Sequence, residues 1–202
     1  MTLWRGKSPL ILASQSRARQ ALLTNAGIDF EAVTAEIDER AVQQASGLSA
    51  PGEIASLLAR EKALSVSTRL SGKFVVGADQ TLALGDRLFS KPAGRAQAAE
   101  QLRALAGHSH ELHSAVAVAR DGKILFEAAA IAVMTMRRLG EAEIDAYLDQ
   151  AGVAVTSSVG AYQLEGLGVH LFERIEGDHF TVLGLPLLPL FAYLRSEGLL
   201  GV

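Results

Sequence analysis

Apolar residues fall into two kinds of run along the chain, and their spacing predicts strands that alternate with helices. Continuous apolar runs at residues 10–13 and 74–78 are typical of buried strands, whereas the apolar positions after Pro51 recur at helical spacing. The same pattern predicts further strands at residues 30–35, 81–84, 88–90, 110–120, 124–137 and 168–175, and helices at residues 17–26, 51–67, 93–105, 141–150 and 187–198. We therefore expect the α/β class, with a mixed twisted sheet and flanking helices.

Turn residues support this order of elements. Gly27 follows the first helical run and is expected to cap it. The pairs Gly85-Asp86 and Asp121-Gly122 each separate two strand-like runs and predict hairpin turns. No internal repeat, low-complexity tract or Pro/Ser-rich linker interrupts the sequence, so residues 1–202 are expected to form a single domain.

Composition argues against several classes of function. With 202 residues, 49% of them hydrophobic, the chain can bury a continuous core without crosslinks. It contains no cysteine, which rules out disulfides, a thiolate nucleophile and cysteine-bound zinc, and we expect a cytoplasmic protein. No signal-like or membrane-spanning apolar stretch is present, so no membrane partner is expected. The net charge of −3 and the dispersed basic residues argue against a nucleic-acid partner, so a phosphate ligand should be small.

The segment that follows the first strand is a candidate for anion binding. Ser14 and Ser16 lie between a strand and a helix start, where free backbone N–H groups and the positive helix end can face a phosphate. Arg19 could add a bidentate contact to the same phosphate. The alternative is that a serine caps the helix while the arginines are solvated.

A second candidate is Asp79, which follows the apolar run at residues 74–78. A carboxylate at the carboxyl end of a strand lies where the ligand crevices of α/β sheets open, so Asp79 could bind a metal or activate water. A turn-capping aspartate is the open alternative. Lys62, in a helical run, and Lys91, before the helix-starting Pro92, are candidate phosphate contacts, although lone lysines are more often solvated.

Two further segments have an open interpretation. The acidic cluster at residues 36–39 ends a strand-like run, where it could hold a hard divalent ion through its oxygens or be merely exposed. The glycines of residues 158–168 permit close approach to a base or sugar, or make a plain loop. His108, His110 and His113 form no convincing metal set, because residues three apart on a strand point to opposite faces, and loop or surface positions are favoured for them.

Six motifs, taken in order, resemble the Maf (septum-formation, Maf-like) family, and the resemblance runs nearly end to end. They are residues 10–16 with Arg19, 36–39, 61–63, 77–79, 91–92 and 184–187. The resemblance implies a two-lobed fold similar to the inosine-triphosphatase architecture, in proteins that are commonly homodimers. It also implies a hydrolase of nucleotide metabolism, which uses a divalent cation (Mg²⁺ or Mn²⁺) to convert a nucleoside triphosphate substrate into its monophosphate and pyrophosphate.

The resemblance also implies roles for particular residues. Asp79 would be the catalytic acid/base that activates water and, with Glu39, a metal ligand, while Arg19, Lys62 and Lys91 would bind the phosphates. These roles suit the residues, because hydrolysis of a phosphoanhydride needs neutralised non-bridging oxygens and a positioned water. A non-catalytic nucleotide-binding regulator of cell division is the alternative, and the retained carboxylate and lysines argue against it.

Departures from the family pattern bear on the substrate. The usual Pro-Arg-Arg is Arg17-Ala18-Arg19 here, so a phosphate contact could be recruited through Arg17. Gln80 stands where threonine is commoner, and Glu165 stands where glutamine is usual, and we place both among the substrate-binding residues. This combination resembles the branch of the family associated with 7-methyl-GTP rather than with dTTP and UTP. Glu165 could accept hydrogen bonds from the edge of a guanine base.

Overall fold

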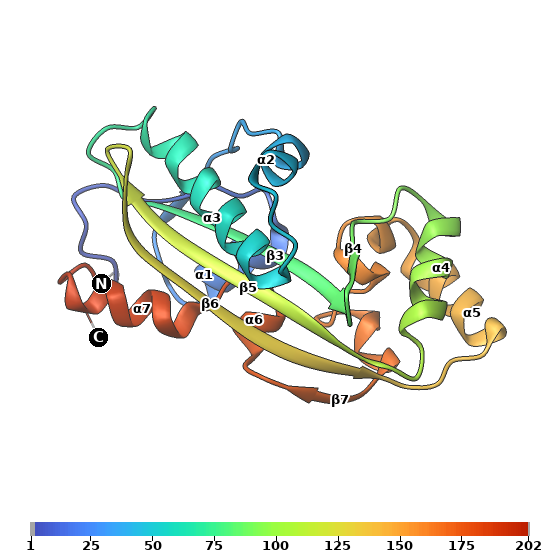
Figure 1. The fold of residues 1–202 in the computed structure, drawn as a ribbon. Helices are drawn as coiled ribbons and strands as arrows, with labels where there is room; N and C mark the ends of the chain where they lie inside the picture. The colour runs from blue at the N-terminus through green and yellow to red at the C-terminus, as the bar shows by residue number, and fades with distance from the viewer. Residues whose placement is uncertain (1–2, 202) are drawn as a thin grey trace. The chain divides into compact units, whose positions relative to one another are not determined.

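A seven-stranded mixed sheet organises the part of the chain that the computed structural model describes, residues 3–201 (Figure 1). Its strands are β1 (Leu10–Leu12), β2 (Phe30–Ala32), β3 (Val75–Leu84), β4 (Arg87–Phe89), β5 (Ser109–Arg120), β6 (Lys123–Met136) and β7 (Phe172–Glu176). The strand order is β2-β1-β3-β5-β6-β7, and β4 pairs with β3. Because β1 pairs in parallel with β2 and β3, whereas the β3–β4 and β6–β7 pairs are antiparallel, the predicted mixed sheet of the α/β class is confirmed.

Helices flank this sheet, as the sequence predicted. They are α1 (Arg17–Asn25), α2 (Glu39–Ser46), α3 (Pro51–Ser67), α4 (Arg95–Leu105), α5 (Glu141–Ala151), α6 (His179–Val182) and α7 (Leu187–Ser196). Three short 3₁₀ turns, η1 (Gly152–Thr156), η2 (Val159–Ala161) and η3 (Leu167–Leu171), follow α5. Within the described residues, no helix is both long enough and apolar enough to cross a lipid bilayer.

The chain forms two compact units. Unit 1 contains the chain up to Gln80, the segment Ser114–Ala130 and the chain from His179 onward. Unit 2 contains Thr81–His113 and Ile131–Asp178. Since β3, β5 and β6 each contribute residues to both units, the units share strands of the same sheet although each has its own buried residues.

Unit 1 is layered, with helices on both faces of its strands. On one face, buried side chains of α1 and α7 pack against β1, β3 and β5 through residues such as Leu23, Leu190 and Val116. On the other face, α3 packs against β5 through alanines alone at the buried positions, namely Ala55, Ala59, Ala63, Ala115, Ala117 and Ala119. Figure 1 shows α3 and α7 on opposite sides of the strands. The alternation along β5 follows from the two-residue period of a strand.

Unit 2 has its own core, in which α4 and α5 supply most of the helical side chains. Its fully or nearly fully buried apolar residues include Leu82, Leu102, Leu105, Leu112, Met134, Met136, Ile144 and Leu148. The hairpin between β5 and β6 turns at Asp121 and Gly122, both with positive φ (51° and 73°), as the Asp-Gly pair predicted.

Several local predictions are wrong. The strands predicted at residues 74–78 and 81–84 are one continuous strand, β3, whose last residues pair with β4 from Leu82 to Leu84. Residues 36–39 do not end a strand, because β2 stops at Ala32 and Glu39 begins helix α2. The strand predicted to start at residue 168 begins only at Phe172, after the turn η3.

The unpredicted helix α2 has a clear physical origin in its caps. The Asp38 side chain accepts a hydrogen bond from the Ala41 N–H at 3.0 Å, and Gly47 ends the helix with a φ of +67°. The helix has only 8 residues, and Val42 is its single large apolar residue, which is too little for a helical apolar pattern to stand out in the sequence.

Candidate functional site

Asp79 lies in the middle of strand β3, not at its carboxyl end as predicted. β1 pairs with β3 only as far as Val76, so Asp79 is placed beyond the last residue of that parallel pair. Its side chain is buried, with a relative exposure of 7% for the whole residue. A buried carboxylate needs compensation by cations or hydrogen bonds, and the surrounding residues of unit 1 supply it.

Lys62 of α3 lies between two carboxylates. Its Nζ is 2.5 Å from Asp79 Oδ1 and 2.8 Å from Glu39 Oε1. The side chains of Lys62 and Asp79 are each 10% exposed, whereas that of Glu39 is 53% exposed. Glu39 therefore forms the solvent side of the cluster, and the Lys62–Asp79 pair forms its buried side.

A glycine on β3 brings Lys62 this close to Asp79. A Cβ atom built on Gly77 would lie 2.1 Å from the carbonyl oxygen of Ala59 and 2.6 Å from the backbone nitrogen of Ala63. Only a residue without a side chain lets α3 approach β3 so closely. Lys62 sits in this turn of α3, so the packing at Gly77 fixes where its ammonium group can reach.

Arg19 of α1 is buried and donates to backbone carbonyls through Nε and Nη1, and its predicted contact with a phosphate stays a prediction. Its Nε donates to the Gly184 carbonyl at 2.7 Å, and its Nη1 donates to the Ala78 carbonyl at 2.7 Å and to Ser14 Oγ at 3.3 Å. Ala78 immediately precedes Asp79. Arg19 thus ties together the segment after β1, the middle of β3 and the loop before α7.

Gln80 is fixed in a similar way by the backbone of α6. Its Nε2 lies 2.9 Å from Ser114 Oγ, 3.0 Å from the Thr181 carbonyl and 3.0 Å from the Val182 carbonyl. Ser114 Oγ also donates to the Thr181 carbonyl at 2.7 Å. Because the amide nitrogen faces these acceptors, the amide oxygen of Gln80 is the group left for a ligand.

The two serines have different roles. Ser16 Oγ accepts from the Arg19 N–H at 3.4 Å and caps α1, so the capping alternative is confirmed for this residue. Ser14 Oγ accepts from the Ser16 N–H at 3.2 Å and from the Arg19 side chain. A hydroxyl that accepts twice retains its own hydrogen to donate. Arg17, the first residue of α1, is exposed.

Burial and charge act in opposite directions on the pKa values here. Burial raises the pKa of Asp79 above its ordinary value, while the positive charges of Lys62 and Arg19 oppose that shift. Burial lowers the pKa of the Arg19 guanidinium, and the negative charges of Asp79 and Glu39 oppose that shift. A buried carboxylate with a raised pKa suits a group that accepts a proton and later releases it.

The structure brings together seven of the residues singled out in the sequence. They all belong to unit 1 and are Ser14, Ser16, Arg19, Glu39, Lys62, Asp79 and Gln80. Lys91 and Glu165 belong to unit 2 and are both exposed, so their predicted contacts with a substrate stay predictions. Within residues 3–201, no group of three or more histidines, aspartates or glutamates is placed to hold a metal ion by itself.

Several residues of the site were missed in the sequence. The carbonyls of Ala78, Thr181 and Gly184 carry no signal, because any residue type has a carbonyl group. Ser114 lies inside a strand-like run that gave it no distinction.

The expected surface position of the histidines is wrong for His110, which is 1% exposed and whose Nε2 lies 2.7 Å from the Tyr162 hydroxyl. It is also wrong for His113, which is 9% exposed.

Known proteins resemble this chain over nearly its whole length. A family model described as Maf-like protein matches residues 9–197. The chain is 71% identical over 202 residues to a protein of Bradyrhizobium diazoefficiens named nucleoside triphosphate pyrophosphatase, and the match covers 100% of both chains. It is 52% identical over 192 residues to a protein of Mesorhizobium japonicum named 7-methyl-GTP pyrophosphatase, with 94% of this chain and 96% of that protein covered.

Solved structures give a weaker likeness. A nucleoside-triphosphatase, or dITP/XTP pyrophosphatase, from Mycobacterium abscessus is 17% identical and covers 95% of this chain and 96% of its own. Its TM-score is 0.40, which is too low to carry an argument about this chain.

Proposed function

The chain belongs to the Maf-like protein family, and on that premise we propose that it is a nucleoside triphosphate pyrophosphatase. It would hydrolyse the anhydride between the α- and β-phosphates and release a nucleoside monophosphate and pyrophosphate. The observation that carries this proposal is the buried carboxylate of Asp79, held 2.5 Å from the Lys62 ammonium at a site where Glu39 meets the solvent. The names of the close relatives support the same reaction.

In the proposed reaction, Asp79 accepts the proton of the attacking water and releases it after the anhydride bond breaks. Burial raises the pKa of Asp79, which brings the carboxylate closer to the range in which a general base works well. Lys62 holds one carboxylate oxygen of Asp79, and the other oxygen would accept the proton of the water. Arg19 fixes the backbone at Ala78 and so keeps Asp79 in place from the chain side.

The N-terminus of α1 is the proposed phosphate site. The first N–H groups of a helix have no partner within the helix, and the Ser16 hydroxyl caps only that of Arg19. A helix N-terminus attracts phosphate through these groups and through the helix dipole. Ser14 can donate its hydroxyl hydrogen, and the exposed Arg17 would add a second arginine beside Arg19, whose Nε and Nη1 already donate to carbonyls.

The residues fit a divalent cation that comes with the substrate. Glu39 and Asp79 place carboxylate oxygens around one point, which Lys62 shares with them. Mg²⁺ is often bound by only one or two carboxylates together with substrate phosphates and waters. The charges of Arg19, Lys62, Glu39 and Asp79 balance, so the site has no surplus positive charge for a triphosphate. When bound, a divalent cation would supply that charge and stabilise the negative charge on the phosphates.

The substrate proposal extends to the base. We infer that 7-methyl-GTP is among the substrates, because the chain has Gln80 and Glu165 and is 52% identical to a relative named for that nucleotide. Glu165 is exposed, and its carboxylate can accept hydrogen bonds from a base.

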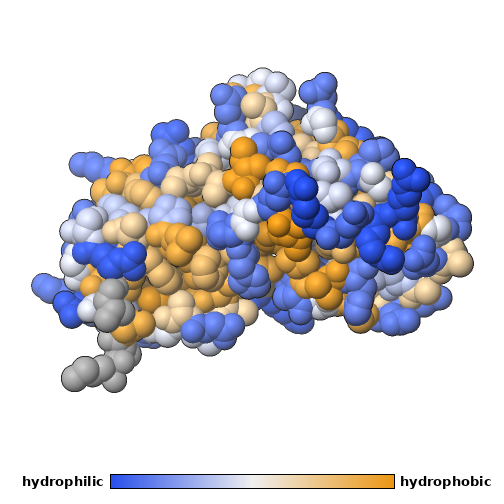
Figure 2. All heavy atoms as spheres, turned by 90° about the horizontal axis from the view of Figure 1, so that it is seen from below, coloured by the Kyte–Doolittle hydropathy of each residue, from blue (hydrophilic) through white to orange (hydrophobic). Residues whose placement is uncertain are grey.

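A cytoplasmic homodimer is the proposed state of the protein. Apolar side chains gather on the face of the molecule shown in Figure 2. Leu188 of α7 is 59% exposed. Exposed apolar area of this kind is often covered by a partner, and a second copy is the partner we propose. Light scattering after gel filtration should give twice the chain mass, and Leu188→Glu should halve it. A monomeric mass for the unmodified protein would contradict the dimer.

The test is release of pyrophosphate and monophosphate from 7-methyl-GTP, GTP, UTP and dTTP with Mg²⁺ or Mn²⁺. Asp79→Asn should lower kcat at least about 100-fold, because it removes the general base. The matched control is Asp86→Asn, which changes an exposed turn residue in the same way and should leave kcat unchanged. A preference for UTP or dTTP would contradict the 7-methyl-GTP proposal alone. If folded protein releases no pyrophosphate from any of these nucleotides, the proposed enzymatic activity is contradicted and a nucleotide-binding regulator is favoured.

Metal dependence has its own test. Chelation of divalent ions should stop the reaction, and calorimetry should detect Mn²⁺ binding in the presence of substrate. Glu39→Gln should raise the Mn²⁺ concentration that gives half-maximal rate, since it removes one oxygen charge. An unchanged rate in the chelator would contradict the proposed metal.

A further inference from the structure

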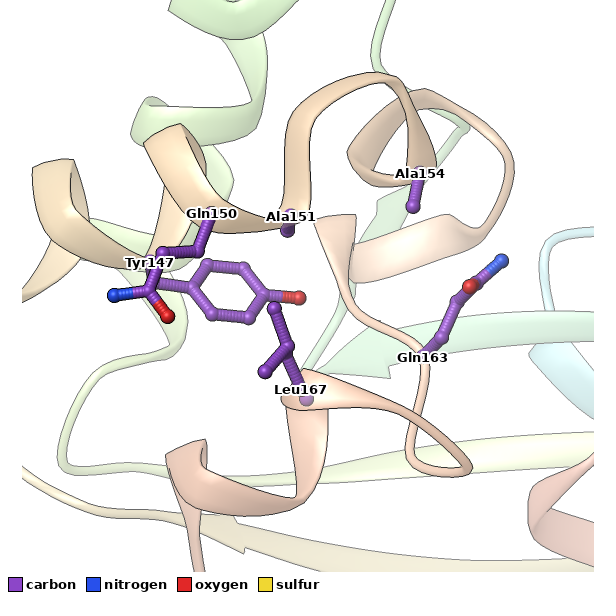
Figure 3. Close-up of a pocket in the computed structure, with 7 residues that line it drawn as sticks. Tyr147, Gln150, Ala151, Ala154, Gln163 and Leu167 are labelled. Atoms are coloured by element: carbon purple, nitrogen blue, oxygen red, sulfur yellow. The ribbon is translucent and has the colours of Figure 1, made fainter.

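Unit 2 contains a small hollow that the proposed chemistry does not use. It has a volume of about 120 Å³ and lies between the end of α5 and the turns η1 and η3. Figure 3 shows the Tyr147 ring extending across it, with the methyl groups of Ala151 and Ala154 directed in from one side and Leu167 from the other. All of these residues belong to unit 2.

The floor of the hollow is preformed. Gly166 and Gly168 donate their N–H groups to the Gln163 carbonyl at 3.1 and 3.0 Å. A Cβ atom built on Gly168 would lie 2.4 Å from that carbonyl oxygen, so only glycine permits this turn. On the opposite wall, the Tyr147 hydroxyl donates to the Ala161 carbonyl at 3.2 Å. The hollow therefore does not need to be built when a ligand arrives.

The lining carries no ionised group. Its polar side chains are the Tyr147 phenol and the amides of Gln150 and Gln163. Burial raises the pKa of Tyr147 to about 12, so the phenol stays neutral. A phosphate would find no compensating positive charge in this lining, which excludes an anionic ligand.

Exposed apolar side chains lie in or next to the segments that line the hollow. Val153 is 91% exposed, Leu167 is 41% exposed and Val169 is 50% exposed, and these residues are in or beside the lining segments. Large apolar side chains left exposed around a concave site indicate a ligand that covers them. The exposed apolar side chains and the hollow therefore indicate the same ligand site.

We propose that this hollow binds the planar ring of a nucleobase. A cavity of roughly 150 Å³ takes up benzene, whereas pockets for whole drug-sized ligands need about 300 Å³ or more, so the hollow fits a ring and not an entire nucleotide. The flat face of Tyr147 offers stacking, and the amide of Gln150 can both donate and accept at the polar edge of a base. The Gln163 amide donates to Ser157 Oγ at 2.8 Å. The choice of a nucleobase, rather than another ring, rests on the proposed function.

The experiment titrates uridine and guanosine, which carry no phosphate, into ¹⁵N-labelled protein and follows amide chemical shifts. The expected result is a saturable shift of the amides of residues 147–168. Ala154→Leu fills the hollow and should weaken binding at least about tenfold, on the scale by which added methylenes discriminate in pockets. Ala142→Leu, which adds the same atoms at an exposed position of α5, should bind as the unmodified protein does.

A second variant guards against misfolding. Leu167→Ala removes an exposed wall of the hollow without entering the core, and it should also weaken binding. Shifts that map outside residues 147–168, binding that survives Ala154→Leu in folded protein, or no shift with either nucleoside would each overturn the proposal. Pyrophosphate release measured separately distinguishes this failure from failure of the proposed function, because the nucleosides carry no anhydride.

Discussion

The ammonium of Lys62 and the carboxylate of Asp79 form a buried ion pair, with Nζ 2.5 Å from Oδ1 and both side chains only 10% exposed. A pair of this kind is a weak contributor to stability as a whole, since both charges are desolvated. Removing Lys62 or Asp79 alone would destabilise the protein, because the remaining charge would be buried without its ion-pair partner. The pair thus couples the stability of unit 1 to the proposed general base.

Lys62→Met should lower the free energy of unfolding by about 3 to 5 kcal/mol, because it leaves the buried charge of Asp79 without its ion-pair partner. Asp79→Asn introduced into the Lys62→Met protein should recover part of this loss. Urea unfolding of the two single variants and the double variant measures the coupling. Strictly additive losses would contradict a direct interaction of the two side chains.

The two arginines of α1 should respond differently to substitution. Arg17→Ala should raise KM for the triphosphate about tenfold with little change in kcat, as expected for loss of one charged contact to a bound phosphate. Arg19→Lys should lower kcat and the free energy of unfolding, since a lysine cannot reproduce the fork that holds the Ala78 and Gly184 carbonyls. Steady-state kinetics of both variants measures kcat and KM. If Arg19→Lys changes KM alone, Arg19 binds phosphate instead of positioning the backbone.

Gly77→Ala should destabilise the protein by about 1 to 3 kcal/mol or more, because its Cβ would overlap the backbone of α3. Gly94→Ala is the matched control. It has extended backbone and no atom within 4 Å of the added Cβ, so its effect should stay within about 0.5 kcal/mol. Denaturant midpoints of the two variants provide the comparison. Equal midpoints would mean that the close approach of α3 to β3 is not tight.

His110 should make stability depend on pH in the acidic range. Burial lowers its pKa from 6.5 to about 4, so between these values the unfolded chain binds a proton that the folded chain does not. The free energy of unfolding should therefore fall as pH falls through this window, by up to about 3 kcal/mol. His110→Phe should flatten that slope between pH 6.5 and 4, measured by urea unfolding.

The control for this prediction is His108→Gln, since His108 is exposed and its substitution should leave the slope unchanged. His110→Phe also removes the partner of the Tyr162 hydroxyl, which costs stability equally at every pH in the window. A slope that persists unchanged in His110→Phe would assign the acid sensitivity to other groups.

Regular patterns in the sequence predicted most elements correctly. The helices α1, α3, α4, α5 and α7 and the β5–β6 hairpin lie close to their expected residues, because each has an apolar period or a turn residue that acts locally. Helix α2 was not predicted, because it is short and has a single large apolar residue. The break expected in the strand at Asp79 was wrong, because β3 continues through polar residues to its pairing with β4.

By itself, the sequence determined the alternation of strands and helices, the α/β class and the residue types suited to phosphoanhydride chemistry. These depend on periodicity, turn residues and side-chain chemistry, which act over a few positions. Only the tertiary structure decided that Lys62 forms an ion pair with Asp79, that Arg19 donates to backbone carbonyls, and that His110 is buried. Such facts depend on contacts between residues far apart in the chain, such as the approach of α3 to Gly77, which no local pattern records.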